Sequence, residues 1–166
     1  MGKITEHAFI KAYDEYADEI FRFCAFRIYD REKAQDIMQD SFTRTWSYIL
    51  AGNEIDNLRA FLYKTARNLC VNELVRGKTF SLDEMQEVTG FDPEDDQTES
   101  GESAAEASIL MQHLSELDPE TQEVITLRYM NGLAVKEIGE ILGLAPNTVS
   151  VRIHRAISEL KKRMHL

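Results

Sequence analysis

The last third of the chain carries residues whose types and spacing fit a defined chemistry. The stretch "IGEILGLAPNTVSVRIHRA", residues 138–156, joins a short apolar run, a glycine and a proline to a run rich in cationic side chains. Guanidinium and imidazole groups donate hydrogen bonds to phosphates and to base edges. The pattern predicts a nucleic-acid-binding surface, and no spacing of carboxylates and histidines in the chain indicates an enzyme. The candidate contacts are Asn147, Thr148, Val151, Arg152, His154 and Arg155.

Two helices and a tight turn are needed to position these side chains. The sequence predicts helices over about 134–142 and 146–163, separated by Gly143, which permits the left-handed backbone of a tight turn. Pro146 presets the first turn of the second helix, although Ala145 before it has no side-chain acceptor to cap that helix. Such a pair is a helix-turn-helix, whose second helix enters the major groove. Its inner apolar stripe is expected from Val149, Ile153, Ala156, Ile157 and Leu160.

The two arginines of the second helix are predicted to point outward. Arg152 and Arg155 are three positions apart, so we expect them on one face. Position favours Arg152 as the reader of a base edge and Arg155 as a phosphate contact. The end of the helix, from Arg152 to Arg163, is basic, which suits phosphates. The alternative is an ordinary amphipathic hairpin with a solvated basic face.

Two further polar surfaces are predicted in the first half of the chain. "AQDIMQDSFTRTW", residues 34–46, places Asp36, Gln39 and Asp40 on one helix face, opposite the apolar residues. In residues 61–76, amide and cationic side chains suited to bases and phosphates are expected to cluster on one side. These are Lys64, Arg67, Asn68, Asn72 and Arg76. For both surfaces the alternative is solvated helix surface without a partner.

The net charge of −10 is concentrated between the two halves of the chain. Residues 81–112 contain no Lys or Arg, whereas the stretches before and after them are each neutral. The acidic stretch has few large apolar side chains and therefore too little surface to bury as a core. We predict a domain at 1–80, an acidic linker at about 81–104 and a second domain at 105–166. The acidity does not argue against nucleic-acid binding by the two ends.

Helical periodicity accounts for nearly all of the chain outside the linker, and no alternating strand pattern of useful length occurs. This predicts an all-α protein of two small helical domains, with a loop at 51–57. The third helix is expected to end near Gly77 as its C-cap. Asp118 and Pro119 are expected to begin the fifth helix. Besides the two C-terminal helices, the predicted helices span about 6–29, 31–49, 58–76, 105–117 and 119–130.

The sequence predicts no metal, cofactor or small-molecule substrate. Cys24 and Cys70 lie in apolar helical patterns and are expected to be buried, reduced thiols. The four histidines are scattered and form no cluster with cysteines. No secretory signal and no membrane-spanning stretch is recognisable, so we expect a cytoplasmic protein that does not insert into a membrane.

The motifs "AQDIMQDSFTRTW", "LRAFLYKTARN" and "LDPETQEVITLRYMNGLAVKEIGEILGLAPNTVSVRIHRA" together resemble bacterial sigma factors of the extracytoplasmic-function (ECF) type. The resemblance covers nearly the whole chain, with two motif blocks in the family's order and a short linker between them. It implies two helical domains, sigma regions 2 and 4, which confer promoter recognition and transcription initiation on core RNA polymerase. It also implies control by an anti-sigma factor.

The resemblance assigns a partner to each N-terminal surface. Asp36, Gln39 and Asp40 match the polar residues that dock on the clamp helices of the largest polymerase subunit. The loop 51–57 and the five polar residues predicted on the following helix match the part that recognises and opens the minus-ten element. There, a base of the non-template strand is flipped into a pocket.

The C-terminal helix from Pro146 matches the reader of the minus-thirty-five element. Its domain also seats on the flap of the second-largest polymerase subunit in the family. Two positions depart from the family pattern: Ala145 stands where Ser or Thr is frequent, and Val151 stands where a polar residue is common. Both departures bear on the promoter sequence that is read more than on the activity itself.

Two other functions fit parts of the sequence. A sigma mimic would bind an anti-sigma factor and no promoter, but known mimics carry a fused receiver domain, which this sequence does not show. A helix-turn-helix repressor would dimerise through its N-terminal half, and it would have no use for the Asp36, Gln39 and Asp40 face together with "FLYKTARN". Comigration with core polymerase on a sizing column separates a sigma factor from a repressor.

Overall fold

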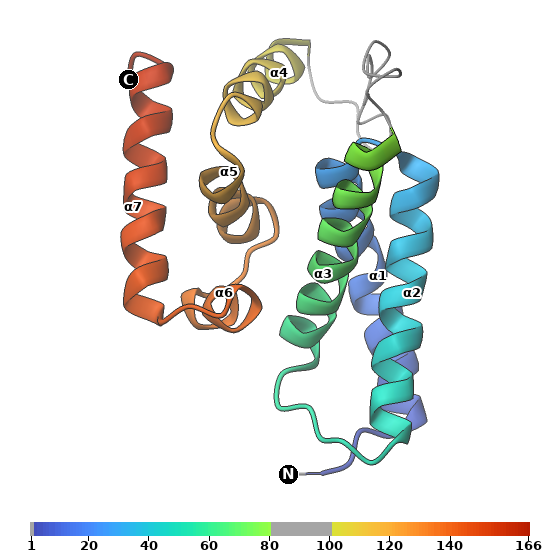
Figure 1. Ribbon diagram of the computed structural model, residues 1–166. Coiled ribbons are helices and arrows are strands. Elements are labelled where there is room, and N and C mark those ends of the chain that lie inside the picture. Colours follow the sequence, from blue (N-terminus) through green and yellow to red (C-terminus); the bar gives the residue numbers. More distant parts are fainter. Residues whose placement is uncertain (1, 81–100) are drawn as a thin grey trace. The chain divides into compact units, whose positions relative to one another are not determined.

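The computed structural model describes residues 2–80 and 101–166, which belong to two compact units, Met1–Phe91 and Asp92–Leu166. Every regular element in the described ranges is a helix (Figure 1), which confirms the all-α fold. The first unit contains α1 (Glu6–Ile28), α2 (Arg31–Leu50) and α3 (Leu58–Phe80). The second contains α4 (Gly101–Ser115), α5 (Pro119–Ile125), a π-helical segment (Thr126–Met130), α6 (Val135–Leu142) and α7 (Pro146–Arg163).

The first unit is a bundle in which α1, α2 and α3 pack against one another (Figure 1). Tyr29 ends α1 in the left-handed conformation with φ 58°, and the carboxylate of Asp30 begins α2 by accepting a hydrogen bond from Lys33 N at 3.1 Å. So short a connection makes α1 and α2 antiparallel neighbours. The core is apolar and includes Ile20, Phe23, Cys24, Met38, Phe42, Leu62, Tyr63, Ala66 and Cys70.

The second unit is built around α7, against which α4, α5 and α6 pack. Asp118 begins α5 by accepting a hydrogen bond from Thr121 N at 3.0 Å, and Pro119 follows at the first helical position, as predicted. The core combines residues from all of these elements: Leu114, Leu117, Val124, Leu127, Leu133, Ile138, Ile141, Val149, Ile153 and Ala156.

Three predicted helix limits differ from the structure. The third helix continues through Gly77 to Phe80, because a helical glycine costs only about 1 kcal/mol relative to alanine and does not by itself end a helix. The helix predicted at 119–130 changes to π-helical hydrogen bonding at Thr126. The predicted linker falls mostly on residues 81–100, outside the described residues, and α4 begins at Gly101 and not near 105.

Candidate functional surfaces

The turn between α6 and α7 fixes the direction of the second helix. Gly143 has φ 69°, the left-handed conformation predicted for it, and Leu144 N donates a hydrogen bond to Gly139 O at 2.9 Å. A Cβ added at Gly139 would lie 2.6 Å from Leu144 O, so the turn approaches α6 more closely than a side chain there allows. The sequence pattern did not indicate this role for Gly139, because a glycine inside a helical pattern otherwise indicates only weak helix propensity.

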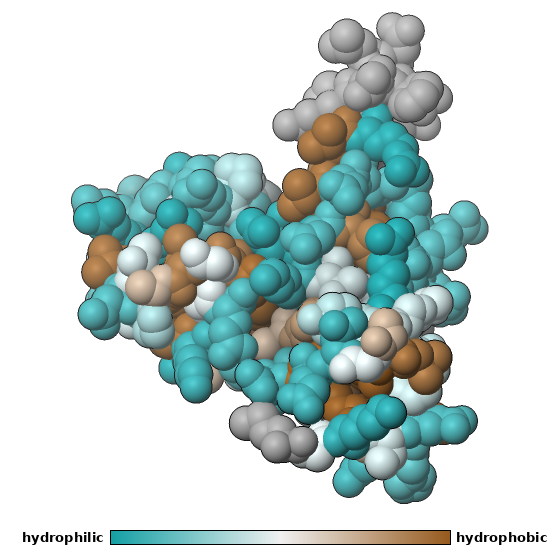
Figure 2. Space-filling model, turned by 60° about the horizontal axis from the view of Figure 1, so that its bottom comes forward, coloured by the Kyte–Doolittle hydropathy of each residue, from teal (hydrophilic) through white to brown (hydrophobic). Residues whose placement is uncertain are grey.

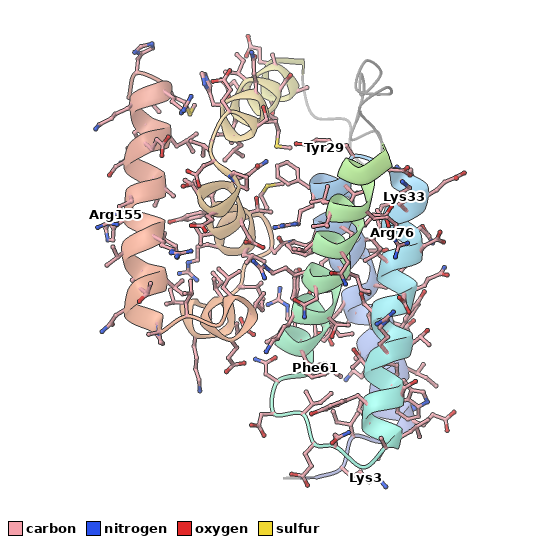
Figure 3. All side chains as sticks on the ribbon, in the orientation of Figure 1. Lys3, Tyr29, Lys33, Phe61, Arg76 and Arg155 are labelled. Atoms are coloured by element: carbon pink, nitrogen blue, oxygen red, sulfur yellow. The ribbon has the colours of Figure 1, made fainter. Side chains whose placement is uncertain are left out.

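α7 has a buried inner face and an exposed outer face. Val149, Ile153 and Ala156 are buried, as the predicted stripe required, while Ile157 and Leu160 are half-buried. Five of the predicted nucleic-acid contacts are exposed: Asn147, Thr148, Val151, His154 and Arg155. Figure 3 shows Arg155 projecting from the side of α7 that faces away from α5. The helix therefore presents a continuous outer face that a DNA groove could cover.

Arg152 differs from the other five candidate contacts. It is half-buried, and its Nη1 lies 3.5 Å from Oε2 of Glu120 in the first turn of α5. Positions 152 and 155 are about 60° apart around a helix, so Arg152 reaches α5 while Arg155 stays exposed. The two arginines are therefore neighbours around α7, but the Arg152 side chain is directed to α5 and the Arg155 side chain is exposed. Nothing local in the sequence indicated Glu120 as a partner.

The C-terminal end of α7 is basic but partly compensated. Lys161 and Lys162 are exposed. Arg163, by contrast, has Nη1 3.4 Å from Oε2 of Glu116 and Nη2 3.4 Å from Oε1 of Glu159. The end of the helix thus offers two exposed lysines for phosphates, while one arginine is occupied within the unit.

The five polar residues predicted on α3 do not all share one face. Lys64, Asn68 and Asn72 are exposed and follow one another at four-residue spacing, so they form one line along the helix. Arg67 is half-buried, and Arg76, nine positions later, lies roughly 180° away around the helix. Arg76 also follows Asn72 at the same four-residue spacing, so four of the five residues form one line along α3, with Arg67 beside its start.

Arg76 belongs to an ion-pair cluster that the sequence analysis missed. Its Nη1 lies 4.0 Å from Oε2 of Glu73, and Nζ of Lys33 in α2 lies 3.1 Å from Oε1 of the same carboxylate. The hydrogen bond to Glu73 raises the pKa of Lys33. Figure 3 shows Lys33 and Arg76 near each other at one end of the bundle. Two cations from different helices are thus held by one glutamate.

An aromatic pair, also missed, flanks the loop 51–57. The rings of Tyr48 and Phe61 are in contact, with centroids 4.9 Å apart and planes tilted by 31°, and Asn53 Nδ2 donates a hydrogen bond to Tyr48 O at 3.1 Å. Arg59 donates two hydrogen bonds to the carboxylate of Glu19, at 2.8 and 2.9 Å, and so fixes the start of α3 on α1. Tyr48 is 40% exposed, so aromatic surface lies open beside the loop.

The polar face predicted on α2 is present. Asp36 and Gln39 are exposed, and Asp40 is half-buried. Oδ2 of Asp40 lies 3.0 Å from Nε of Arg44, one turn further along α2. The face is therefore a mixture of acidic and basic groups, and Arg44 is a member that the sequence analysis did not include.

The remaining candidate groups are structural. Cys24 and Cys70 are buried and form no disulfide, as predicted. A hydrogen bond with Cys70 and burial raise the pKa of the Cys24 thiol, which keeps it protonated and unreactive. Within residues 2–80 and 101–166, no cluster of three metal-ligating side chains occurs. In those same ranges, no helix has the length and apolar character needed to cross a membrane.

Comparison with known proteins gives matches to both halves of the chain. Residues 12–79 match the family model of sigma-70 region 2, and residues 107–160 match that of sigma-70 region 4. The chain is 30% identical to RNA polymerase sigma factor YlaC of Bacillus subtilis over 92% of this chain and 89% of the relative. It is 29% identical to the ECF RNA polymerase sigma factor SigW of the same organism, over 98% of this chain and 91% of SigW.

Solved structures have the same fold. The sigma factor RpoE of Bartonella quintana, in its complex with the anti-sigma factor NepR, is 21% identical and has a TM-score of 0.73, with 95% of this chain and 97% of that chain covered. The two family models occur in the order expected from the motifs. The chain belongs to the sigma-70 family of RNA polymerase sigma factors, in its extracytoplasmic-function group.

Proposed function

We propose that this sigma factor reads its promoter with two separate surfaces, one in each unit. The outer face of α7 binds the minus-thirty-five element in the major groove through Asn147, Thr148, Val151, His154 and Arg155. The line of Lys64, Asn68 and Asn72 on α3 binds the minus-ten element, together with the loop 51–57. Arg67 beside that line and Arg76 at its end contact phosphates.

The observation that carries this proposal is the construction of α7. Its inner face is buried, its turn is fixed by the close approach at Gly139, and its outer face is exposed and, apart from Val151, polar. A helix held in this way can enter a groove without losing contacts to its own domain. Lys161 and Lys162 continue the same helix with positive charge that suits the phosphate backbone.

The second part of the proposal is that the α2 face binds core RNA polymerase at the clamp helices. Asp36 and Gln39 are exposed, and Asp40 lies beside them on the same helix face. The second unit seats on the polymerase flap. Acting with core polymerase, the protein works in the cytoplasm.

Core binding is tested with the double variant Asp36→Arg/Asp40→Arg. The matched control is Asp14→Arg/Asp18→Arg, which makes the same charge change at the same spacing on α1. Because surface substitutions change stability little, both variants should keep the helix content of the parent. The α2 variant should no longer comigrate with core polymerase or support run-off transcription, and the α1 variant should do both. Equal binding by the two variants would remove the α2 face from the proposal.

We further propose that an anti-sigma factor covers part of the free protein. Apolar side chains lie exposed on both units, among them Leu74 and Val75 on α3 and Tyr129 and Met130 on the π-helical segment. Figure 2 shows apolar patches on an otherwise hydrophilic surface. Exposed apolar surface of this kind suits a protein partner. Hydrogen exchange of these segments with and without the candidate anti-sigma factor tests the proposal, since unprotected amides would contradict it.

A further inference from the structure

Val151 is an apolar side chain in the middle of the outer face of α7. It is 47% exposed, although valine is usually found inside proteins. The residues one turn before and one turn after it, Asn147 and Arg155, are polar and exposed, and so is His154 beside them. Val151 is therefore an apolar island on a surface whose other members suit hydrogen bonding to DNA.

The packing of α7 fixes the direction of this side chain. Val149 and Ile153, two positions before and two positions after Val151, are buried. Two positions correspond to about 200° around a helix, so Val151 points away from the core that holds its neighbours. On one flank, the pair between Arg152 and Glu120 ties α7 to α5. The helix cannot turn Val151 inward without unpacking the unit.

The chemistry of valine allows one kind of base contact. Its side chain has no hydrogen-bond donor or acceptor, and in the major groove the distinctive apolar group is the C5-methyl of thymine. A valine in a helix has nearly one rotamer, so holding its methyl groups against a base costs little entropy. Val151 also lies in the second turn of α7, within the part of a recognition helix that reaches base edges.

On the basis that α7 reads the upstream promoter element, as proposed above, we propose that Val151 sets a preference for thymine at one position of that element. It does so by contact with the C5-methyl group of the base. Asn147 and Arg155 contact the neighbouring bases and phosphates on either side. Arg152 is a positioning residue, since its guanidinium is engaged with Glu120 at the edge of the face.

The test uses the complete chain with core RNA polymerase and a DNA library randomised across the upstream element. Sequences transcribed by the parent are selected, and each thymine of the selected element is then replaced by deoxyuridine, which lacks only the methyl group. At one position the replacement should lower transcription about fourfold, the equivalent of one buried methyl group. The other positions should respond little.

Variants at position 151 assign that effect to Val151. Val151→Thr and Val151→Ser both introduce a hydroxyl, but only threonine keeps a γ-methyl group. The threonine variant should retain the preference for thymine over deoxyuridine, and the serine variant should lose it. Because Val151 is exposed, both should melt like the parent.

The outcomes separate this inference from the proposed function. Selection of an upstream element in which no thymine responds to deoxyuridine would overturn the role of Val151 and leave α7 as the promoter reader. A thymine preference that persists in Val151→Ser would do the same. If no upstream sequence is selected at all, α7 does not read the promoter, and both proposals fail.

Discussion

The close approach at Gly139 gives a sharp prediction for the helix-turn-helix. In Gly139→Ala, the new Cβ would lie 2.6 Å from the backbone oxygen of Leu144. That oxygen is a backbone atom of the turn, so it cannot move aside by a side-chain rotation. The turn must therefore shift, and the hydrogen bond from Leu144 N to Gly139 O, 2.9 Å long, is strained or lost.

The expected magnitude follows from opposing effects. Alanine favours the helix by about 1 kcal/mol relative to glycine. Overpacking costs about 1–3 kcal/mol, and a lost hydrogen bond costs about 1 kcal/mol more. The free energy of unfolding of the second unit should therefore fall by about 1–3 kcal/mol.

Gly77→Ala is the matched control. Gly77 is also helical, but a Cβ added there meets nothing within 4 Å. The same chemical change should thus raise the stability of the first unit, by up to about 1 kcal/mol. Urea denaturation followed by circular dichroism measures both variants. Hydrogen exchange of the α6 and α7 amides then locates the loss caused by Gly139→Ala in the second unit.

A Gly139→Ala variant as stable as the parent would contradict this prediction. Such a result would mean that the turn after α6 relaxes at no cost. If both glycine variants lost stability equally, the effect would lie in the glycine-to-alanine change itself and not in the contact with Leu144.

Two further predictions concern ionised groups. Glu73→Gln should release Lys33 and Arg76 for contact with phosphates. Binding to non-specific duplex DNA should then tighten, and the salt dependence of its affinity should steepen by about 1 for each additional phosphate that is neutralised. Fluorescence anisotropy at several salt concentrations measures this slope, and an unchanged slope would contradict the prediction. The hydrogen bond from the Thr121 hydroxyl lowers the pKa of Asp118 below its ordinary value of 3.8, so the stability that this carboxylate adds is present above that value and is lost as the pH falls through the lower, folded-state pKa. Asp118→Asn keeps a helix cap but should lose less stability in acid than the parent, whereas Asp118→Ala should destabilise the second unit by about 1 kcal/mol at neutral pH. If the parent and Asp118→Asn unfold identically in acid denaturation, the carboxylate is not the source of the pH dependence.

Local chemistry is what the sequence could predict well. The left-handed turn at Gly143, the proline that begins α7 and the cap at Asp118 each follow from residues within a few positions of one another. The buried stripe of α7 follows from its period. These features place the outer face of α7, which is why most of its candidate contacts are exposed as expected.

Contacts between distant positions could not be predicted in this way. Glu120 and Arg152 are brought together only when α5 packs on α7, and Lys33 meets Glu73 only when α2 packs on α3. Arg67 and Arg76, by contrast, lie at opposite edges of the predicted α3 cluster for a reason that the sequence already contains. Nine positions make two and a half turns, so the helical period alone should have separated them.

The ion pairs bear on how the free protein meets DNA. Glu120, Glu73 and Glu116 each lie beside a cation of the predicted DNA-binding units. A cation that already has a carboxylate neighbour benefits less from a phosphate than a solvated lysine does, because one ion pair is exchanged for another. We expect this exchange to reduce non-specific affinity and to leave the apolar base contact proposed for Val151 unaffected. These glutamates lie outside the acidic stretch 81–112 that carries the net charge. They should raise the ratio of specific to non-specific binding, which governs promoter choice among many competing sites.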